Sequence, residues 1–302
     1  MKITQLALAA AFLLPAAAHA QELTGTLKKI KETGSITLGV RDSSVPFSYL
    51  DDKQQPVGYA IDICMKVVDA VKSKLDMPGL KVSMNPVTSA TRIPLMANGT
   101  IDLECGSTTN NLDRQKQVAF TNTHFLTASK FVAKSGAKLS TIDDLKGKTV
   151  VSTSGTTNIL QLNQANTARG LGLHILTAKD HAESFLLVET GRAAAFVMDD
   201  VLLASLVASS KDPGGYTIST DAFSAPEPYA IMLRKDDAPF KAVVDRATAA
   251  LYSSPEQAAL YAKWFTSPIP PRGLNLNLPM APVLERAFQK PSDNADPAHY
   301  GS

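Results

Sequence analysis

Short apolar runs rich in β-branched residues alternate along the chain with longer stretches in which apolar residues recur every three or four positions. The short runs predict buried strands, and the longer stretches predict amphipathic helices. In the first third of the chain we predict a strand at 36–40, a helix at 60–74, a strand at 82–85, a helix at 91–97 and a strand at 101–104. This alternation is typical of an α/β fold with a mostly parallel sheet.

The same rhythm restarts after Lys134. There we predict a short helix at 141–145, a strand at 149–151, a helix at 158–169, a strand at 174–176, a helix at 181–190, a strand at 194–198 and a helix at 201–209. The pattern therefore indicates two α/β units of about a hundred residues each, arranged in series.

The last part of the chain has predicted helices but no sheet of its own. An extended segment at 226–234 precedes predicted helices at 240–252 and 255–265 and a proline-rich tail. We expect the chain to cross into a second lobe near 129–134, to return near 229–233, and to pack its last helices on the first lobe. Two extended crossings make a hinge.

The N-terminus predicts a secretory signal. Lys2 precedes an apolar run at 6–18 and a small-residue ending around His19, and no later apolar run reaches the roughly 18 residues that cross a bilayer. The mature chain would begin at Gln21, which offers no cysteine for a lipid anchor, so we expect a soluble periplasmic protein. The expected divisions are a signal peptide at 1–20, the first part of lobe 1 at 21–130, lobe 2 at 131–230, and a return to lobe 1 with C-terminal helices and tail at 231–302.

The charge balance excludes two classes of partner. The formal net charge is only +2, and acidic and basic residues are interspersed. Such a composition lacks the positive surface that nucleic acid or an anionic membrane requires. We expect a monomer with no cofactor and no metal. The two cysteines, Cys64 and Cys105, either pair in an oxidising compartment or stay free, since Cys64 also falls on the apolar side of its helix.

Candidate chemistry gathers where strands end and helices begin. The loops 105–114 and 153–157 each follow a predicted strand, and Asp199 follows a third. In open α/β sheets such positions face one cleft, where helix N-termini and arginine bind carboxylates and aspartate binds an ammonium group. The residues predicted to hold an α-carboxylate and an α-amino group are Ser107, Thr109, Arg114, Thr156, Thr157 and Asp199.

A second set of residues could select the ligand side chain. Its members are Arg41, Ser89, Arg92 and His181. Three arginines against one aspartate complement the two carboxylates and one ammonium of glutamate or aspartate. A buried charge that loses its partner costs on the order of 2 to 5 kcal/mol, so a neutral analogue would be rejected.

Each of these residues also has a plainer interpretation. Arg114 could be one more solvated residue on a helix, and Arg41 could form only a surface ion pair with Asp42, which stabilises little. Asp199 could cap the helix that follows it. His181 could simply be the start of a helix.

Taken together, the residues match a known family over nearly the whole mature chain. The matching strings are Ser43 to Tyr49, Val57 to Tyr59, Arg92 to Leu95, Glu104 to Asn111, Arg114 to Gln117, Ser154 to Thr157, Ala178 to His181, Met198 to Asp200 and Lys263 to Phe265. On these strings the chain resembles the periplasmic glutamate/aspartate-binding proteins of ABC importers. The resemblance implies a two-lobed type II periplasmic-binding-protein fold, each lobe a mostly parallel sheet flanked by helices, with a two-strand hinge.

The resemblance also implies roles for the site residues. Arg114 and Thr157 would hold the α-carboxylate, and Ser107, Thr109 and Asp199 the ammonium end. The residues implied for the side-chain carboxylate are Arg41, Ser89, Arg92 and His181. The lobes would close on the ligand without covalent chemistry, and the closed complex would dock on a membrane permease. The preference between glutamate and aspartate and the protonation state of His181 stay open.

Two other classes of function are compatible with the same fold. A periplasmic dehydratase would need a general acid in the cleft, for which Glu104 and Glu183 are the candidates. A sensor module would present its bound ligand to a receptor instead of a permease. Glutamine, asparagine or a dicarboxylate without an amine are alternative ligands, which the arginines and Asp199 disfavour.

Overall fold

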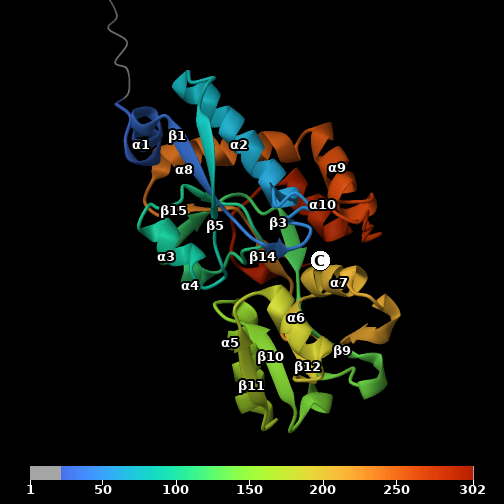
Figure 1. Ribbon diagram of the computed structural model, residues 1–302. Coiled ribbons are helices and arrows are strands. Elements are labelled where there is room, and N and C mark those ends of the chain that lie inside the picture. Colours follow the sequence, from blue (N-terminus) through green and yellow to red (C-terminus); the bar gives the residue numbers. More distant parts are fainter. Residues whose placement is uncertain (1–21, 302) are drawn as a thin grey trace, which may run out of the picture.

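Two lobes joined by a narrow waist make up the protein. The computed structural model describes residues 22–301. In Figure 1 the upper lobe carries both ends of the described chain, coloured blue to cyan and orange to red, while the lower lobe carries the middle of the chain in green and yellow. The predicted signal peptide at 1–20 lies outside the described residues. Within residues 22–301, no helix combines the length and the apolar character that crossing a membrane requires.

The first lobe contains a five-stranded sheet. In spatial order its strands are β5 (Lys81–Pro86), β1 (Ser35–Val40), β6 (Leu103–Glu104), β15 (Met232–Arg234) and β7 (Val118–Phe120). β1 pairs in parallel with β5 and β6, and β15 pairs antiparallel to β6 and β7. Only β15 therefore runs against the other strands of this sheet.

The sheet of the second lobe repeats this plan. In spatial order its strands are β11 (His174–Ala178), β10 (Thr149–Thr153), β12 (Ala195–Asp199), β9 (Ser129–Lys134) and β13 (Tyr216–Ile218). β10 is parallel to β11 and β12, while β9 is antiparallel to β12 and β13. The predicted two-lobed α/β fold with mostly parallel sheets is confirmed. In each sheet the reversed strand is the one that enters from the hinge, where the chain arrives from the opposite direction.

Helices flank both sheets (Figure 1). Those of the first lobe are α1 (Gly25–Thr33), α2 (Tyr59–Leu75), α3 (Arg92–Ala97), α4 (Leu112–Gln115), α8 (Ala238–Tyr252), α9 (Pro255–Tyr261) and α10 (Pro282–Gln289). Those of the second are α5 (Thr157–Arg169), α6 (His181–Glu189) and α7 (Asp200–Ser209). α2 forms because Ile63, Val67 and Val71 recur every four residues and all are buried. α8 packs against α2 and α1.

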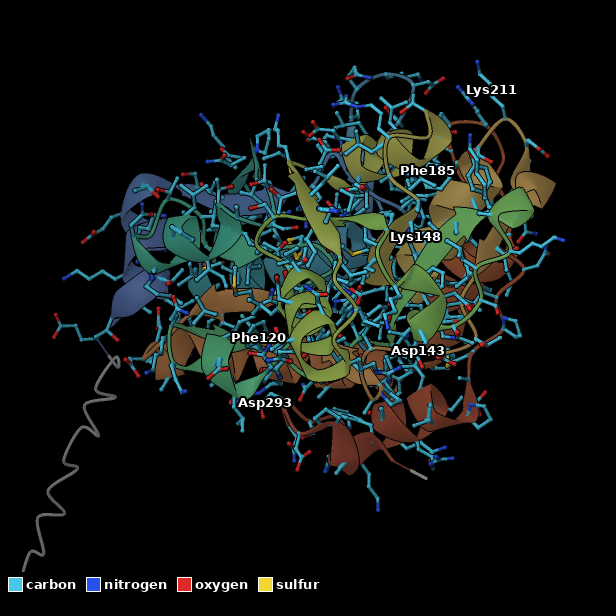
Figure 2. All side chains as sticks on the ribbon, turned by 90° about the horizontal axis from the view of Figure 1, so that it is seen from below. Phe120, Asp143, Lys148, Phe185, Lys211 and Asp293 are labelled. Atoms are coloured by element: carbon cyan, nitrogen blue, oxygen red, sulfur yellow. A yellow bond between two sulfur atoms is a disulfide. The ribbon has the colours of Figure 1, made fainter. Side chains whose placement is uncertain are left out.

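Side chains fill the interiors of both lobes (Figure 2). In the second lobe the ring of Phe185 of α6, which Figure 2 labels, packs at a tilt of 42° against Tyr216 of β13, with ring centroids 4.9 Å apart. In the first lobe Cys64 of α2 and Cys105 form a disulfide, so the question that the sequence left open is answered by pairing. This cross-link ties α2 to the loop that follows β6.

The hinge is a pair of antiparallel strands. β8 (Phe125–Thr127) pairs with β14 (Glu227–Tyr229), so the outgoing and returning crossings lie side by side. Phe47 packs edge-on against both Phe125 and Tyr229, with ring centroids 5.1 and 5.3 Å apart. The predicted single strand at 226–234 is wrong in detail. Its first part belongs to the hinge, and its last part, β15, joins the first-lobe sheet.

Candidate binding site between the lobes

The carboxyl ends of four strands meet between the lobes. β1 and β6 of the first lobe lead into Arg41 and the loop after Glu104, while β10 and β12 of the second lead into the start of α5 and into Asp199. The enclosed space there measures only about 10 Å³, room for about one water molecule. A ligand can therefore enter only when the lobes separate. The residues that line this space are Ser89, Arg92, Ser107, Thr109, Thr156, Thr157, Asn158, His181, Met198, Asp199 and Leu202.

The two predicted residues outside that lining contact it directly. Arg41 is 2 % exposed, and its Nη2 donates to Ser89 Oγ at 2.9 Å. Arg114 is 8 % exposed, and its Nη1 donates to the carbonyl oxygen of Thr109 at 2.8 Å. The structure therefore brings all ten sequence-predicted side chains together.

The three arginines lie near one another in a buried setting. Burial, reinforced by the positive charge of Arg92, lowers the pKa of Arg41 to about 10 and that of Arg114 to about 9. Both groups remain positive at neutral pH. Arg92 donates through Nη1 to the Ser107 carbonyl oxygen at 3.3 Å and also contacts the Thr108 hydroxyl. The cluster is a concentrated positive charge that a buried anion would stabilise.

Several donors of the cluster have no partner. Nη1 of Arg41, Nε of Arg92 and Oγ of Ser107 are buried and meet no hydrogen-bond acceptor among residues 22–301. A buried polar group without a partner costs about 1 to 3 kcal/mol, and more when it is charged. A ligand that brings acceptor oxygens would satisfy these atoms.

Local capping sets the direction of Arg114 and Thr157. The side chain of Asn111 caps α4 by accepting from the Arg114 backbone N–H at 2.9 Å. Thr156 caps α5 by accepting from the Ile159 N–H at 3.3 Å. The free N–H groups at the start of α5, which spans 13 residues, therefore face the cleft with the helix dipole behind them.

Asp199 contributes a carboxylate to the lining of the site. Its Oδ1 accepts from Asn158 Nδ2 at 2.8 Å, and its Oδ2 accepts from the Tyr229 hydroxyl. Burial raises the pKa of Asp199, although these two hydrogen bonds oppose the shift. An incoming ammonium group would favour the ionised form. Tyr229 carries no signal in the sequence, because only its place on the hinge strand brings it to Asp199.

His181 contacts residues of both lobes. Nδ1 lies 2.9 Å from Thr153 Oγ1, and Nε2 lies 3.5 Å from Nη2 of Arg41. Since a guanidinium can only donate, Nε2 carries the lone pair and Nδ1 donates to Thr153. Burial, followed by the charges of Arg41 and Arg92, holds the pKa of His181 well below its ordinary value, so the ring is neutral.

The lobes also meet through backbone. Gly155, at φ +77°, lies so close to the first lobe that a Cβ on it would be 2.5 Å from Cα of Ala90. Its carbonyl oxygen accepts from Nη2 of Arg114 at 3.3 Å. The hydroxyl oxygens of Thr109 and Thr157 are 3.4 Å apart across the same gap. The closed arrangement thus depends on a position without a side chain.

Two further carboxylates lie near the site but do not line it. Glu227 of the hinge strand accepts from Gln161 Nε2 at 2.8 Å, and burial, with the negative charge of Asp199, raises its pKa to about 8. Glu104 is fully buried behind Arg92. Among residues 22–301, no three His, Cys, Asp or Glu side chains are grouped so that they could hold a metal ion.

Comparison with protein families gives a match over most of the chain. Residues 36–267 match the description of bacterial extracellular solute-binding proteins, family 3. The chain is 52 % identical over 286 residues to the L-glutamate/L-aspartate-binding protein of Pseudomonas aeruginosa, covering 94 % of each chain. It is 46 % identical over 270 residues to the glutamate/aspartate import solute-binding protein of Escherichia coli, covering 89 % of each.

Solved structures have the same fold. A mutant of ArgBP from T. maritima superposes with a TM-score of 0.70 at 25 % identity, covering 80 % of this chain and 99 % of that one. An ancestral amino acid-binding protein, a precursor of cyclohexadienyl dehydratase, gives a TM-score of 0.68 at 26 % identity, covering 80 % and 100 %. The fold is therefore found both in amino-acid-binding proteins and in a precursor of an enzyme.

Proposed function

Because the chain belongs to family 3 of the bacterial extracellular solute-binding proteins, we propose that it captures L-glutamate and L-aspartate between its lobes and delivers them to an ABC importer. Its relatives with 46 to 52 % identity are transport proteins that bind these amino acids. The chain is a binding protein and not an enzyme. Its partners are the amino acid and a membrane permease, with no nucleic acid.

The observation that carries the proposal is the buried arginine cluster with its unsatisfied donors. Three guanidinium groups and Asp199 line or adjoin an enclosed polar space. An acidic amino acid has two carboxylates for the arginines and one ammonium for the aspartate. Glutamine or asparagine would leave one arginine without an anion, a loss on the order of 2 to 5 kcal/mol.

We assign the site residues to two ends of the ligand. Arg114 and the N–H groups of Thr156 and Thr157 would hold the α-carboxylate, and Ser107, Thr109 and Asp199 would hold the ammonium. Arg41, Ser89 and Arg92 would hold the side-chain carboxylate, with His181 orienting Arg41 through its Nε2, 3.5 Å away. A neutral His181 predicts that affinity does not fall as the pH rises through the ordinary titration range of histidine.

The import role implies a location and a chain path. We place the mature protein in the periplasm after removal of the segment 1–20. The division into lobe 1 at 21–130, lobe 2 at 131–230 and the return at 231–302 remains a prediction. The lobes would close about the hinge because the ligand contacts both of them at once.

Isothermal titration calorimetry tests the proposed function. The mature chain is unfolded and refolded to remove carried-over ligand, and then titrated with glutamate, aspartate, glutamine, asparagine and succinate. We expect dissociation constants of about 1 µM or below for glutamate and aspartate only. Binding of neither acid would contradict the proposal and would turn attention to a sensor module with a different ligand.

A further inference from the structure

Glu104 lies behind the site and does not line it. It ends β6, is 0 % exposed, and its Oε2 accepts from the Thr108 hydroxyl at 2.5 Å. Nη1 of Arg92 contacts the same hydroxyl and lies 3.9 Å from Glu104 Oε1. Because the single hydroxyl hydrogen of Thr108 goes to Glu104, its lone pairs are left for Arg92. The Thr108 hydroxyl thereby connects the Glu104 carboxylate to the Arg92 guanidinium.

Gly106 makes room for this carboxylate between two arginines. A Cβ at position 106 would lie 2.4 Å from Glu104 Oε1 and 3.0 Å from Cγ of Arg41. The carboxylate therefore sits close to both Arg41 and Arg92, the two first-lobe arginines assigned to the side chain of the ligand. In a buried setting one charge at this range changes the energy of a neighbouring charge substantially.

The net formal charge of the buried site residues is lower by one when Glu104 is included. Arg41, Arg92 and Arg114 are positive, Asp199 and Glu104 are negative, and all five side chains are at most 8 % exposed. His181 is neutral because burial lowers its pKa. Three positive and two negative charges leave the site at +1, whereas glutamate and aspartate carry a net charge of −1.

We propose that Glu104 is a specificity-determining residue: its carboxylate, placed behind Arg92 and beside Arg41, leaves the enclosed site one positive charge in excess, which an acidic amino acid neutralises. This inference rests on the proposed function. Without the negative charge of Glu104 the site would be at +2, and its preference for an anionic over a neutral side chain would increase. Glu104 thus moderates the discrimination between acid and amide.

The test compares Glu104→Gln with the unaltered protein. Glutamine keeps an oxygen acceptor for Thr108 but removes the charge. The dissociation constants of aspartate and asparagine are measured by titration, the weaker one by displacement. The dissociation constant of asparagine is then divided by that of aspartate, and this ratio is compared between the two proteins. We expect this ratio to rise about tenfold in Glu104→Gln, because removing a negative charge strengthens the binding of the aspartate side-chain carboxylate but not of the neutral asparagine amide. The α-carboxylate and ammonium are common to both ligands, so effects on them cancel in the ratio.

A fall in the ratio of the two dissociation constants would have a different cause. If Glu104 only holds Arg92 in place, its loss weakens the grip on the aspartate carboxylate, and the ratio falls. A fall or an unchanged ratio overturns the inference while leaving the proposed function intact. If the unaltered protein binds neither glutamate nor aspartate, both are overturned.

Two further variants separate charge from geometry. Thr108→Val keeps both charges but removes the bridging hydroxyl, so the ratio should not rise. Glu104→Asp keeps the charge and serves if Glu104→Gln fails to fold, as judged by its circular dichroism. In Glu104→Asp we expect a ratio within about twofold of the unaltered protein, and a tenfold change would show that the position of the carboxylate, and not its charge, decides.

Discussion

Buried titratable residues divide into two groups near the hinge. Burial lowers the pKa of His124 to about 3, and its ring lies 5.8 Å between centroids from Phe47 and Tyr59. Neither ring nitrogen of His124 has a hydrogen-bond partner among the described residues. Glu227 shifts the other way, to a pKa of about 8. Both side chains are therefore mostly uncharged at pH 7.

His124 makes stability depend on acid. Its folded-state pKa of about 3 lies below the unfolded value, so the stabilisation by the neutral ring is complete above about pH 6.5 and is lost as the pH falls toward 3. We expect His124→Phe, which preserves the aromatic packing, to remove this dependence. Denaturant unfolding at several pH values should show that, below pH 6.5, the unfolding free energy of the variant rises relative to that of the unaltered protein by about 1.4 kcal/mol for each pH unit.

The control uses a histidine at the surface. His174 is exposed on β11, so His174→Phe exchanges a histidine for phenylalanine without altering the buried ring beside the hinge. If the curves for His124→Phe and the unaltered protein run parallel between pH 7 and pH 4, the buried ring does not account for the acid sensitivity.

The charged residues of the site are easier to predict from the sequence than the residues that surround and position them. Arg41 and Asp199 stand out because each lies at the end of a strand. Tyr229, Glu227 and His124 give no such signal. The pairing of β14 with β8, in which Glu227 faces Thr127, brings Tyr229 to Asp199 and places the other two residues beside the hinge. Segments a hundred residues apart cannot be aligned from local patterns.

At the scale of elements, the turn between β10 and α5 is a close backbone contact between the lobes. Gly155 adopts a left-handed conformation there, and the space that a Cβ would occupy is filled by the backbone of Ser89 and Ala90. The turn therefore works both as the start of a helix that attracts a carboxylate and as a surface that meets the opposite lobe. Any side chain at this position would hold the lobes apart.

Gly155→Ala should weaken ligand binding by about tenfold or more. The added Cβ would lie 2.5 Å from Cα of Ala90, a backbone atom that cannot move aside cheaply. Gly147→Ala is the matched control, because Gly147 has φ +70° and nothing within 4 Å of the added atom. Both variants incur a strain of about 1 to 2 kcal/mol, but only Gly155→Ala should change the dissociation constant. Equal affinities would contradict a role for Gly155 in closure.

The regular elements were predictable because their apolar periods are strong. The helices and strands predicted between 36 and 209 are present, with ends within two residues of the prediction. Most elements without a prediction are short or lie outside that region, such as β2 (Ser43–Ser44), β3 (Ser48–Leu50), β4 (Pro56–Val57), β7 and α10. The segment 129–134, predicted as the crossing into the second lobe, is instead the six-residue strand β9 within that lobe's sheet, and the crossing lies just before it at β8. Strands of two or three residues are too short for a period, and their pairing is decided by tertiary contacts.

At the scale of the molecule, the hinge is a slender connection between two well-packed bodies. β8 and β14 contribute three residues each, whereas each lobe has its own five-stranded sheet. Motion is therefore easier at the hinge than within a lobe. The ligand would stabilise the closed arrangement by contacting Arg114 on one side and the start of α5 on the other.

Removing the ligand should open the molecule. We expect small-angle X-ray scattering to give a larger radius of gyration for refolded, ligand-free protein than for protein saturated with glutamate. At a ligand concentration of one hundred times the dissociation constant, the free energy of unfolding should increase by about 2.7 kcal/mol. Asparagine at the same concentration serves as the control, and an identical scattering curve with and without glutamate would exclude closure.

The chain path through the hinge makes the second lobe exchangeable. Because β8 and β14 run antiparallel and adjacent, the second lobe leaves and re-enters the first at neighbouring points. A segment whose ends meet can be replaced as one cassette by recombination, without cutting either core. Arg41 and Arg92 would stay with the recipient, whereas Asp199 would travel with the insert. Relatives could thus inherit the residues that select the ligand side chain from one ancestor and the residue that binds the ammonium group from another.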